Sequence, residues 1–453
     1  MDFRDAAWFS EAIFIAPPFT AFLDAYAVDP YAALMDVHGT IFTGATFRGL
    51  ASFSTTNFRG SASFGATTFE GEANFLGAIF DGDAGFPKSR FGGEAVFSGA
   101  TFACDLTFAG ARFEQLRELH ILCYRTVDCD QAVFAQQATL YISARRVSLH
   151  AAVLEVGGNL FVRWAELSLE GADFREPSLL ARLVSAASQP EPALMEWETP
   201  EGVTPWVCRL GAPSEGVAPR VVSLRHAKVA QLTLAGVDLR ACRFQGAYGL
   251  GSVRLERVLF ASPPSRWRIR HGRWPTRWTR RQTLAEEHLW RHVRGHGTGW
   301  YDEEQFVRSP DWLAARSDLL EPEKIAGLYR ALRKGREDNK DEPGAADFYY
   351  GEAEMRRQRP TAGYRAWLGT AYGTWAERVV LWLYWLVSGY GLRASRSLCA
   401  LFVAILLVAI GLDLWGFEPD RSYTHTDERR CLLLKAASVC CGRQQPGSQP
   451  VVR

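Results

Sequence analysis

Residues 64–80 read Phe-Gly-Ala-Thr-Thr-Phe-Glu-Gly-Glu-Ala-Asn-Phe-Leu-Gly-Ala-Ile-Phe, and this stretch decides the fold. Its phenylalanines are separated by steps of five, six and five residues, and the alternation continues on both sides, giving a repeat of eleven residues. A period of this regularity predicts stacked identical units instead of one globular core. The complete series is Phe42, Phe47, Phe53, Phe58, Phe64, Phe69, Phe75, Phe80, Phe86, Phe91, Phe97, Phe102, Phe108 and Phe113.

The spacing within the repeat fits neither a helix nor a strand of a flat sheet. An amphipathic helix needs apolar residues at steps of three and four, and a half-buried strand needs steps of two. Alanine stands two residues before most of the phenylalanines, and glycine and small polar residues fill most other positions. We therefore expect a coil in which each short segment forms one side, its aromatic residue points to the axis, and the small residues turn the corners.

The motif Ala-(Asp/Asn)-(Leu/Phe)-x-x in this register resembles that of the pentapeptide-repeat family. The resemblance implies a mainly β fold, a right-handed quadrilateral β-helix with two eleven-residue repeats per coil. The sixth residue in alternate sides departs from the strict repeat of five. Strong matches return at Ala235–Leu239 and Ala241–Phe244, so the core ladder also includes Leu234, Leu239 and Phe244.

Composition shifts divide the rest of the chain. We expect an N-terminal cap or partial repeat over residues 1–35, because the register extrapolates backwards to Phe3, Phe9, Phe14 and Tyr31. The sequence predicts the following further parts: the β-helix over 36–262 with an inserted loop at about 176–218, an arm rich in arginine and tryptophan over 263–310, a small helical region over 311–376 with helices at 321–340 and 345–357, a membrane region over 377–417, and a disordered tail over 418–453.

Two apolar stretches make up the predicted membrane region. Residues 397–417 contain fifteen consecutive apolar residues and approach the roughly 20 residues that span a bilayer. Residues 378–392 are apolar over a shorter length, which favours an interfacial helix. Lysine and arginine counts do not decide the orientation. The N-terminus lacks a signal pattern, so we expect the repeats on the cytoplasmic face of a cell membrane. The architecture resembles bacterial membrane-anchored pentapeptide-repeat proteins.

The arm over 263–310 allows three interpretations. Its tryptophans could pack on the end of the β-helix while its arginines stay solvated. Alternatively, the mixture of basic and aromatic residues could contact an anionic membrane surface or single-stranded nucleic acid. We favour the first interpretation.

Few residues suggest chemistry. His288, His292 and His296 lie four residues apart and could share a helix face toward zinc, but the glycines around His296 argue against a continuous helix. Residues 387–391 read Val-Ser-Gly-Tyr-Gly, which is similar to a potassium-channel filter, yet no full span precedes them. We therefore predict no catalytic, cofactor-binding or metal-binding residues, and no enzyme.

The leading functional hypothesis is a membrane-anchored, non-enzymatic scaffold or interaction module with a protein partner. The net charge of +1 predicts no strong partner from charge alone, and we expect neither a nucleic acid nor a small-molecule substrate as the partner. Two alternatives stay open. One is a DNA mimic that binds a topoisomerase, as some pentapeptide-repeat proteins do, although this needs an acidic rod. The other is a component of a membrane channel or transport assembly.

Overall fold

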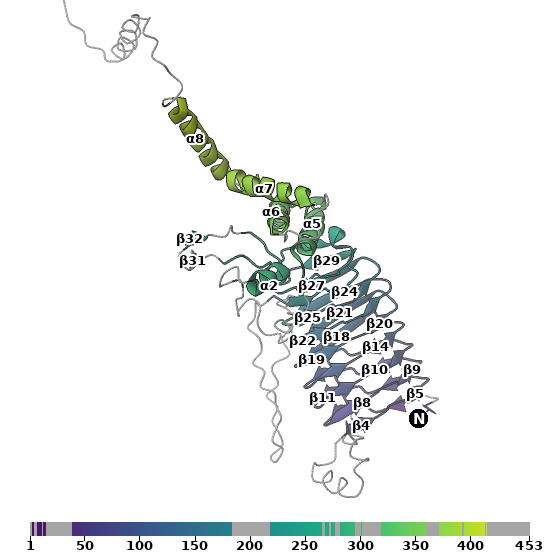
Figure 1. The fold of residues 1–453 in the computed structure, drawn as a ribbon. Helices are drawn as coiled ribbons and strands as arrows, with labels where there is room; N and C mark the ends of the chain where they lie inside the picture. The colour runs from purple at the N-terminus through teal and green to yellow at the C-terminus, as the bar shows by residue number, and fades with distance from the viewer. Residues whose placement is uncertain are drawn as a thin grey trace, which may run out of the picture. The chain divides into compact units, whose positions relative to one another are not determined.

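The computed structural model describes residues 2–3, 7–10, 12–14, 39–183, 218–264, 268–270, 273–276, 281–294, 300, 319–358, 371–391, 394–412 and 414. The chain divides into two compact units, Met1–Leu381 and Trp382–Arg453. The first unit contains a four-sided β-solenoid of about nine turns, whose strands are all parallel within each of four sheets (Figure 1).

Two of the four sheets, named here sheet A and sheet B, begin at the N-terminus. Sheet A contains β1 (Asp2–Phe3), β5 (Thr46–Phe47), β9 (Thr68–Phe69), β13 (Arg90–Phe91), β17 (Arg112–Phe113), β20 (Val133–Phe134), β23 (Val153–Leu154) and β26 (Asp173–Phe174). Sheet B contains β2 (Ala7–Trp8), β6 (Ala51–Ser52), β10 (Ala73–Asn74) and β14 (Ala95–Val96).

The other two sheets, sheet C and sheet D, continue to the C-terminal end of the solenoid. Sheet C contains β3 (Ile13–Phe14), β7 (Asn57–Phe58), β11 (Ile79–Phe80), β15 (Thr101–Phe102), β18 (Glu118–Cys123), β21 (Ala138–Ser143), β24 (Gly158–Arg163), β27 (Ser178–Arg182), β29 (Leu232–Ala235) and β30 (Arg254–Glu256). Sheet D contains β4 (Gly39–Ile41), β8 (Ser61–Ser63), β12 (Ala84–Gly85), β16 (Leu106–Thr107), β19 (Thr126–Asp128), β22 (Arg146–Ser148), β25 (Glu166–Ser168) and β28 (Arg220–Ser223).

Phenylalanines one turn apart stack face to face inside the solenoid. The ring centroids of Phe58 and Phe80 lie 4.5 Å apart, and those of Phe80 and Phe102 lie 4.8 Å apart, close to the separation of neighbouring strands. Perpendicular contacts such as Phe75–Phe86 join adjacent columns. Every residue of the predicted ladder is buried. Each buried phenylalanine contributes ~1.5–3 kcal/mol, so the ladder is the main source of stability.

The length of a turn decreases along the solenoid. Phe58 pairs with Phe80, twenty-two residues later, as two eleven-residue repeats require. Phe102 pairs with Cys123, twenty-one residues later, and Val133 pairs with Val153, twenty residues later. Beyond β14, sheet B has no further strand in the described residues, and β18, β21 and β24 are six residues long. These long strands alternate buried and half-exposed residues, which explains why the phenylalanine register loosens there.

The first residues of the chain extend the solenoid. β1 pairs with β5 in register, and the ring of Phe3 stacks on Phe47 at 4.7 Å. The ring of Phe9 stacks on Phe53 at 4.9 Å. The extrapolated register therefore holds at Phe3 and Phe9, while Tyr31 lies outside the described residues.

The inserted loop begins later than residue 176, where the sequence places it. β27 is a solenoid strand, and its Leu180 pairs with Leu160 on one side and Leu234 on the other. The glutamate and proline just before it suggest a loop by composition, but they form only the corner that precedes the strand. Residues 184–217 lie outside the described residues.

Helices cover the C-terminal end of the solenoid within the first unit (Figure 1). They are η1 (Leu250–Ser252), α2 (Ala285–Val293), α5 (Pro322–Asp338) and α6 (Glu342–Arg357), and a short antiparallel pair, β31 (Arg268–Arg270) and β32 (Arg273–Thr276), precedes α2. Pro322 suits the first turn of α5, and the Asp341 side chain accepts a hydrogen bond from the Gly344 amide at the start of α6. Both helices lie where the sequence predicts them.

The helices continue the hydrophobic core of the solenoid. Ile325, Tyr329 and Leu332 of α5 and Phe348 of α6 are buried in the same cluster as the ladder. The ring of Phe348 meets Phe260 edge to face at 5.2 Å. The last coil is therefore closed by aromatic side chains from the helices, as an open solenoid end requires.

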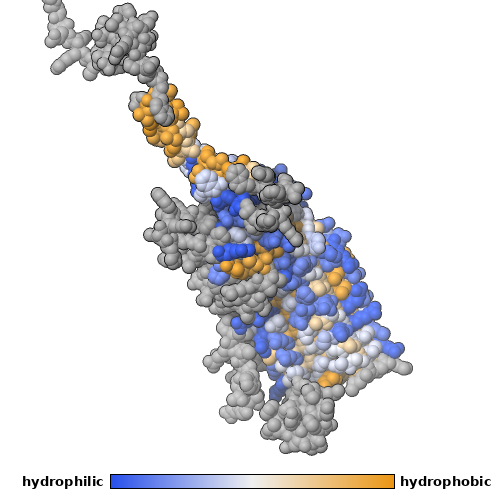
Figure 2. Space-filling view, in the orientation of Figure 1, coloured by the Kyte–Doolittle hydropathy of each residue, from blue (hydrophilic) through white to orange (hydrophobic). Residues whose placement is uncertain are grey.

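Two apolar helices follow, α7 (Ala371–Ser388) and α8 (Ala394–Gly411). α7 begins before the predicted start at residue 378, because the polar residues upstream join the helix. It also ends before the predicted end at residue 392. Gly389, Tyr390 and Gly391 all have positive φ and end it. α8 starts before residue 397, and residues 415–417 lie outside the described residues. None of its residues is buried, and hydrophobic side chains cover it (Figure 2).

Candidate interaction surface

The predicted ladder residues all point into the solenoid, so a binding surface has to be built from outward residues. Along a strand of sheet C the two classes alternate strictly. In β21, Leu140 and Ile142 are buried, whereas Thr139, Tyr141 and Ser143 are half-exposed. The candidate surface therefore consists of positions that the repeat motif does not specify.

The outer face of sheet C carries a stripe of stacked rings. His120 of β18, Tyr141 of β21 and Phe161 of β24 occupy the same register position on successive turns. The ring centroids are 4.5 Å apart for His120–Tyr141 and 5.3 Å apart for Tyr141–Phe161. This stripe is not evident from the sequence, because the alternation of outward residues becomes visible only once the six-residue strands are known.

A hollow of about 540 Å³ lies on the same face, toward its C-terminal end. Outward residues of successive strands line it, including Asn159, Leu179, Thr233 and Arg254, which share one register position. Ser178, Gln231 and Ser252 are among the other lining residues. The lining offers a guanidinium, several amide and hydroxyl groups, and the leucine side chain.

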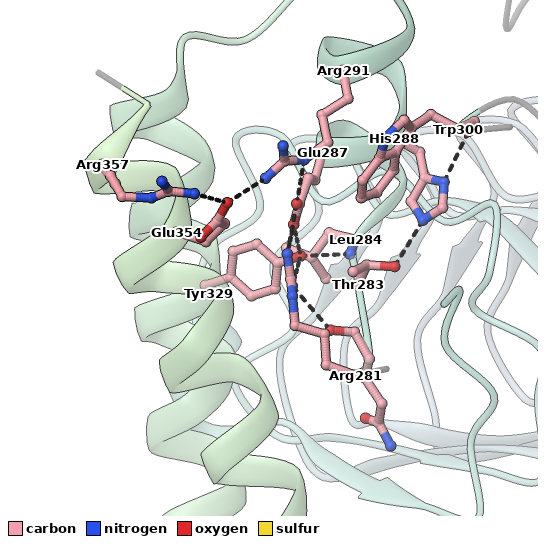
Figure 3. A network of polar contacts seen from close by, with 11 residues as sticks. Arg281, Thr283, Leu284, Glu287, His288, Arg291, Trp300, Tyr329, Glu354 and Arg357 are labelled. Carbon is pink, nitrogen blue, oxygen red and sulfur yellow. Dashed lines mark hydrogen bonds and ion pairs between the residues drawn. The ribbon is translucent and has the colours of Figure 1, made fainter. Parts of the chain in front are cut away.

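A buried charged network holds the helices over the end of the solenoid (Figure 3). The Arg281 guanidinium donates to both carboxylate oxygens of Glu287, at 2.6 and 2.7 Å. The Tyr329 hydroxyl donates to Glu287 at 2.6 Å, and Arg291 Nε donates to it at 2.7 Å. Burial opposes the ionisation of Glu287, but Arg281 and Arg291 hold its pKa at about 2. Glu287 is therefore a carboxylate on which α2 and α5 converge.

The network continues into α6. Arg291 Nη2 donates to Glu354 at 3.3 Å, and Arg357 donates to the same oxygen at 2.6 Å. Arg291 and Glu354 are buried. The Arg291 guanidinium lies 4.7 Å from the centroid of the Trp300 ring. The interpretation that this arm packs on the β-helix is correct for Trp290 of α2, whose side chain is buried in the same core cluster as the phenylalanine ladder. The expectation of solvated arginines is wrong for Arg281 and Arg291, which are buried inside the interface, whereas Arg294 is exposed.

The Glu286 side chain caps the backbone at the C-terminal end of the solenoid. One of its carboxylate oxygens accepts a hydrogen bond from the Phe244 backbone amide, and Arg243 lies close enough to attract its charge. Burial raises the pKa of Glu286, although that hydrogen bond and Arg243 oppose the shift. The carboxyl group thus satisfies a backbone donor that the end of a sheet would otherwise leave without a strand partner.

Two of the three histidines considered for zinc, His288 and His292, lie in the described part of the chain. His288 is buried, and its two ring nitrogens face the Thr283 hydroxyl at 2.7 Å and the Trp300 carbonyl at 2.9 Å. Burial lowers the pKa of His288 to about 4. His292 is half-exposed and His296 lies outside the described residues. No metal-binding group of three His, Cys, Asp or Glu side chains occurs in the described part of the chain.

Two further features of the chain have structural roles. Burial raises the pKa of the Cys123 thiol to about 12, so it is not a thiolate nucleophile at neutral pH. The stretch at residues 387–391, which is similar to a channel filter, is the turn that ends α7, where the Ser388 hydroxyl accepts a hydrogen bond from the Gly391 amide at 3.0 Å.

Comparison with protein families gives one match, to the model described as pentapeptide repeats (9 copies), over residues 42–90. No curated protein and no solved structure matches the chain. The matched residues are the turns in which the phenylalanine columns are most regular, with their alanines buried beside the rings. The solenoid turns formed by residues 42–90 are pentapeptide repeats, and a solenoid of such repeats is a structural fold that is not typical of enzymes.

Proposed function

We propose that this chain is a protein-interaction module, a non-enzymatic scaffold held at the cytoplasmic face of a cell membrane by α8. The observation that carries the proposal is the stripe His120–Tyr141–Phe161 on the outer face of sheet C. Aromatic rings are the side chains most often central to protein interfaces, because they bury a large area at a small entropic cost. The filled interior of the solenoid supports an external site.

The composition and exposure of α8 support the membrane part of the proposal. The helix has 18 residues, is long and apolar enough to cross a membrane, and has none of its side chains buried. Exposing such a helix to water costs about 25 cal/mol for each Å² of apolar surface. A lipid environment removes that cost. The buried free thiols of Cys123 and Cys129 suit the reducing cytoplasm.

The two alternative functions have less support. A DNA mimic needs a continuous acidic surface, whereas arginines and acids alternate on the outside of sheet A, as in the Arg90–Glu114 and Arg112–Glu155 pairs. A channel needs several spanning helices, and among the described residues one helix meets the length and composition required to cross a membrane. The interaction module is therefore preferred.

Position-specific photocrosslinking tests the interaction function. A benzophenone side chain replaces Phe161, on the outer face of sheet C, in the full-length chain in membranes of its native host. The matched control replaces Val133, a half-buried outward residue of sheet A. We expect a discrete crosslinked protein from position 161 and none from position 133. Equal patterns from both positions, or no adduct from either, contradict the proposal.

A further inference from the structure

We propose that the outer face of sheet C binds the same face of a second copy of this chain, about a two-fold axis that runs parallel to the strands between β24 and β27. This inference rests on the proposed interaction function and names its partner. An axis in this position exchanges the two halves of the face, so that β18, β21 and β24 of one copy lie over β30, β29 and β27 of the other. The shape, the charges and the size of the face carry the inference.

The outward side chains of these six strands form two columns that run along the solenoid. The first column begins with Glu118 of β18 and ends with Arg254 of β30, because each residue in it pairs with the next across successive turns. The second column lies two residues later on every strand, from His120 to Glu256. The proposed axis keeps each column over its own counterpart and reverses the order of the strands.

The two halves of the face differ in shape. In the second column, one half carries the rings of His120, Tyr141 and Phe161, and the other half carries Ala181 and Ala235. The hollow of about 540 Å³ opens beside β27, β29 and β30, in the half that carries the alanines.

The proposed axis fits the projecting half to the recessed half. It places Phe161 of one copy over Ala181 of the second copy. It likewise places Tyr141 over Ala235. A two-fold axis along the solenoid would instead set the rings of one copy against the rings of the other and leave the two hollows facing each other. Close packing at the centre of an interface therefore favours the axis that exchanges the halves.

The charges at the ends of the columns are complementary under the same axis. Glu118 of one copy meets Arg254 of the second copy in the first column. In the second column, His120 meets Glu256. Glu118 and His120 also lie 3.3 Å apart within one copy. Because the axis is two-fold, each contact between copies occurs twice, and every acidic side chain of the two columns faces a basic one or a histidine.

The size of the face suits a reversible association. Six strands with six-residue lengths cover about 24 Å by 20 Å, or roughly 500 Å² on each copy. The total of about 1,000 Å² lies at the lower end for specific interfaces. Arg163 lies at the margin, where its guanidinium is 5.3 Å from the centroid of its own Trp164 ring. Anchoring by α8 in one membrane would raise the effective concentration of the copies for each other.

Photocrosslinking of the full-length chain in membranes tests the arrangement. A benzophenone side chain in place of Phe161 should give an adduct with twice the mass of the chain. Digestion with trypsin should place the attachment in residues 176–182, which contain Ala181. Attachment within residues 147–163, which contain Phe161 itself, would set the two ring-bearing halves against each other and overturn the proposed axis.

A charge exchange tests the contact between Glu118 and Arg254. The variant E118R sets two like charges against each other at both symmetric contacts, and R254E does the same, so each should lower the yield of the dimer adduct by about fivefold or more. The double variant E118R/R254E restores opposite charges and should recover most of the yield, which a damaged fold would not do. The control variant E94R makes the same charge change at an exposed position before β14 of sheet B and should leave the yield within about twofold.

Two further results would overturn the inference. One is a double variant that crosslinks as poorly as E118R and R254E alone. The other is an adduct between position 161 and a different protein. In that case the proposed interaction function stands and only the second copy is rejected as the partner. If position 161 gives no adduct at all, the interaction function and the inference both fail.

Discussion

Glu287 accepts hydrogen bonds from Arg281 through both of its carboxylate oxygens, and both side chains are buried where α2 meets α5. A buried ion pair adds little net stability over an apolar pair, but removing one partner leaves an uncompensated charge in the interior. The closure of the solenoid by α2, α5 and α6 therefore depends on Glu287.

The substitution Glu287→Ala should destabilise the first unit by about 3–5 kcal/mol, because it strands Arg281 and Arg291 without their shared carboxylate. Thermal unfolding followed by circular dichroism measures the effect. Glu94→Ala, at an exposed position after β13, is the matched control and should change the stability by less than about 0.5 kcal/mol. Equal stability of the two variants would show that the network does not hold the helices.

The phenylalanine columns should be most sensitive at their centre. Phe75 is fully buried between Phe53 and Phe97, which stack on its two faces at 4.9 Å each. Phe75→Ala should cost about 3–5 kcal/mol, whereas Phe75→Leu should retain much of the stability. Phe3 has a stacking partner on one side and is only partly buried, so Phe3→Ala should cost less. Denaturant unfolding compares the three variants, and an equal cost at Phe3 and Phe75 would argue against a continuous ladder.

One corner of the solenoid requires glycine for a reason of space. A Cβ atom built on Gly71 would lie 2.5 Å from the Gly49 carbonyl oxygen of the preceding turn, a backbone atom that cannot move alone. Gly71→Ala should therefore destabilise the fold by about 1–3 kcal/mol. At Gly85 the nearest atom to a new Cβ belongs to Pro87 at 3.6 Å, an ordinary contact, so Gly85→Ala should be nearly neutral. Thermal unfolding distinguishes the two, and a neutral Gly71→Ala would be inconsistent with the tight stacking of turns.

Stability should fall as the pH decreases from neutral. Burial lowers the pKa of His288 from 6.5 to about 4, so the unfolded chain binds a proton there that the folded chain excludes. The contribution of the neutral His288 ring to the folding stability is fully present above pH 6.5 and is lost progressively as the pH falls toward 4. It should amount to about 2 kcal/mol between pH 7 and pH 5. Glu287, whose pKa is about 2, stays ionised in this window.

Urea unfolding at pH 7 and pH 5 measures this difference. In the wild-type chain, the change in the free energy of unfolding between the two pH values includes the contribution of His288 and those of all other titrating groups. The variant His288→Asn lacks the histidine contribution, so its free energy of unfolding should decrease less between pH 7 and pH 5. Parallel decreases in the two proteins would mean that His288 does not contribute to the pH dependence.

The solenoid is predictable from sequence because its core repeats. Each buried phenylalanine stands at a fixed distance from the next, and the pairing of Phe58 with Phe80 follows from that spacing alone. The length of the later turns is not predictable in the same way. Leucine, valine and isoleucine replace phenylalanine there, and a residue such as Leu140 fits a five-residue side and a six-residue strand equally well.

The candidate surface and the charged network could not be predicted, because both depend on residues that meet across turns. Tyr141 and Phe161 are twenty residues apart and look like isolated aromatics until the register is known. Likewise, Glu287 and Arg291 on a short helix read as solvated charges, and only the positions of α5 and α6 reveal that they are buried. The helices themselves were predictable from their local apolar spacing.

Alkaline carbonate extraction of membranes that contain the full-length chain tests the central claim, an interaction module anchored by α8. We expect the wild-type chain to stay with the membrane in carbonate and to be released by detergent. Leu406→Arg places a charge in the middle of α8 at a cost of about 3 kcal/mol and should shift the protein toward the carbonate wash. Ser397→Arg, near the start of α8, should behave like the wild type, because its side chain can reach the interface. Release of the wild-type chain by carbonate would contradict the claim.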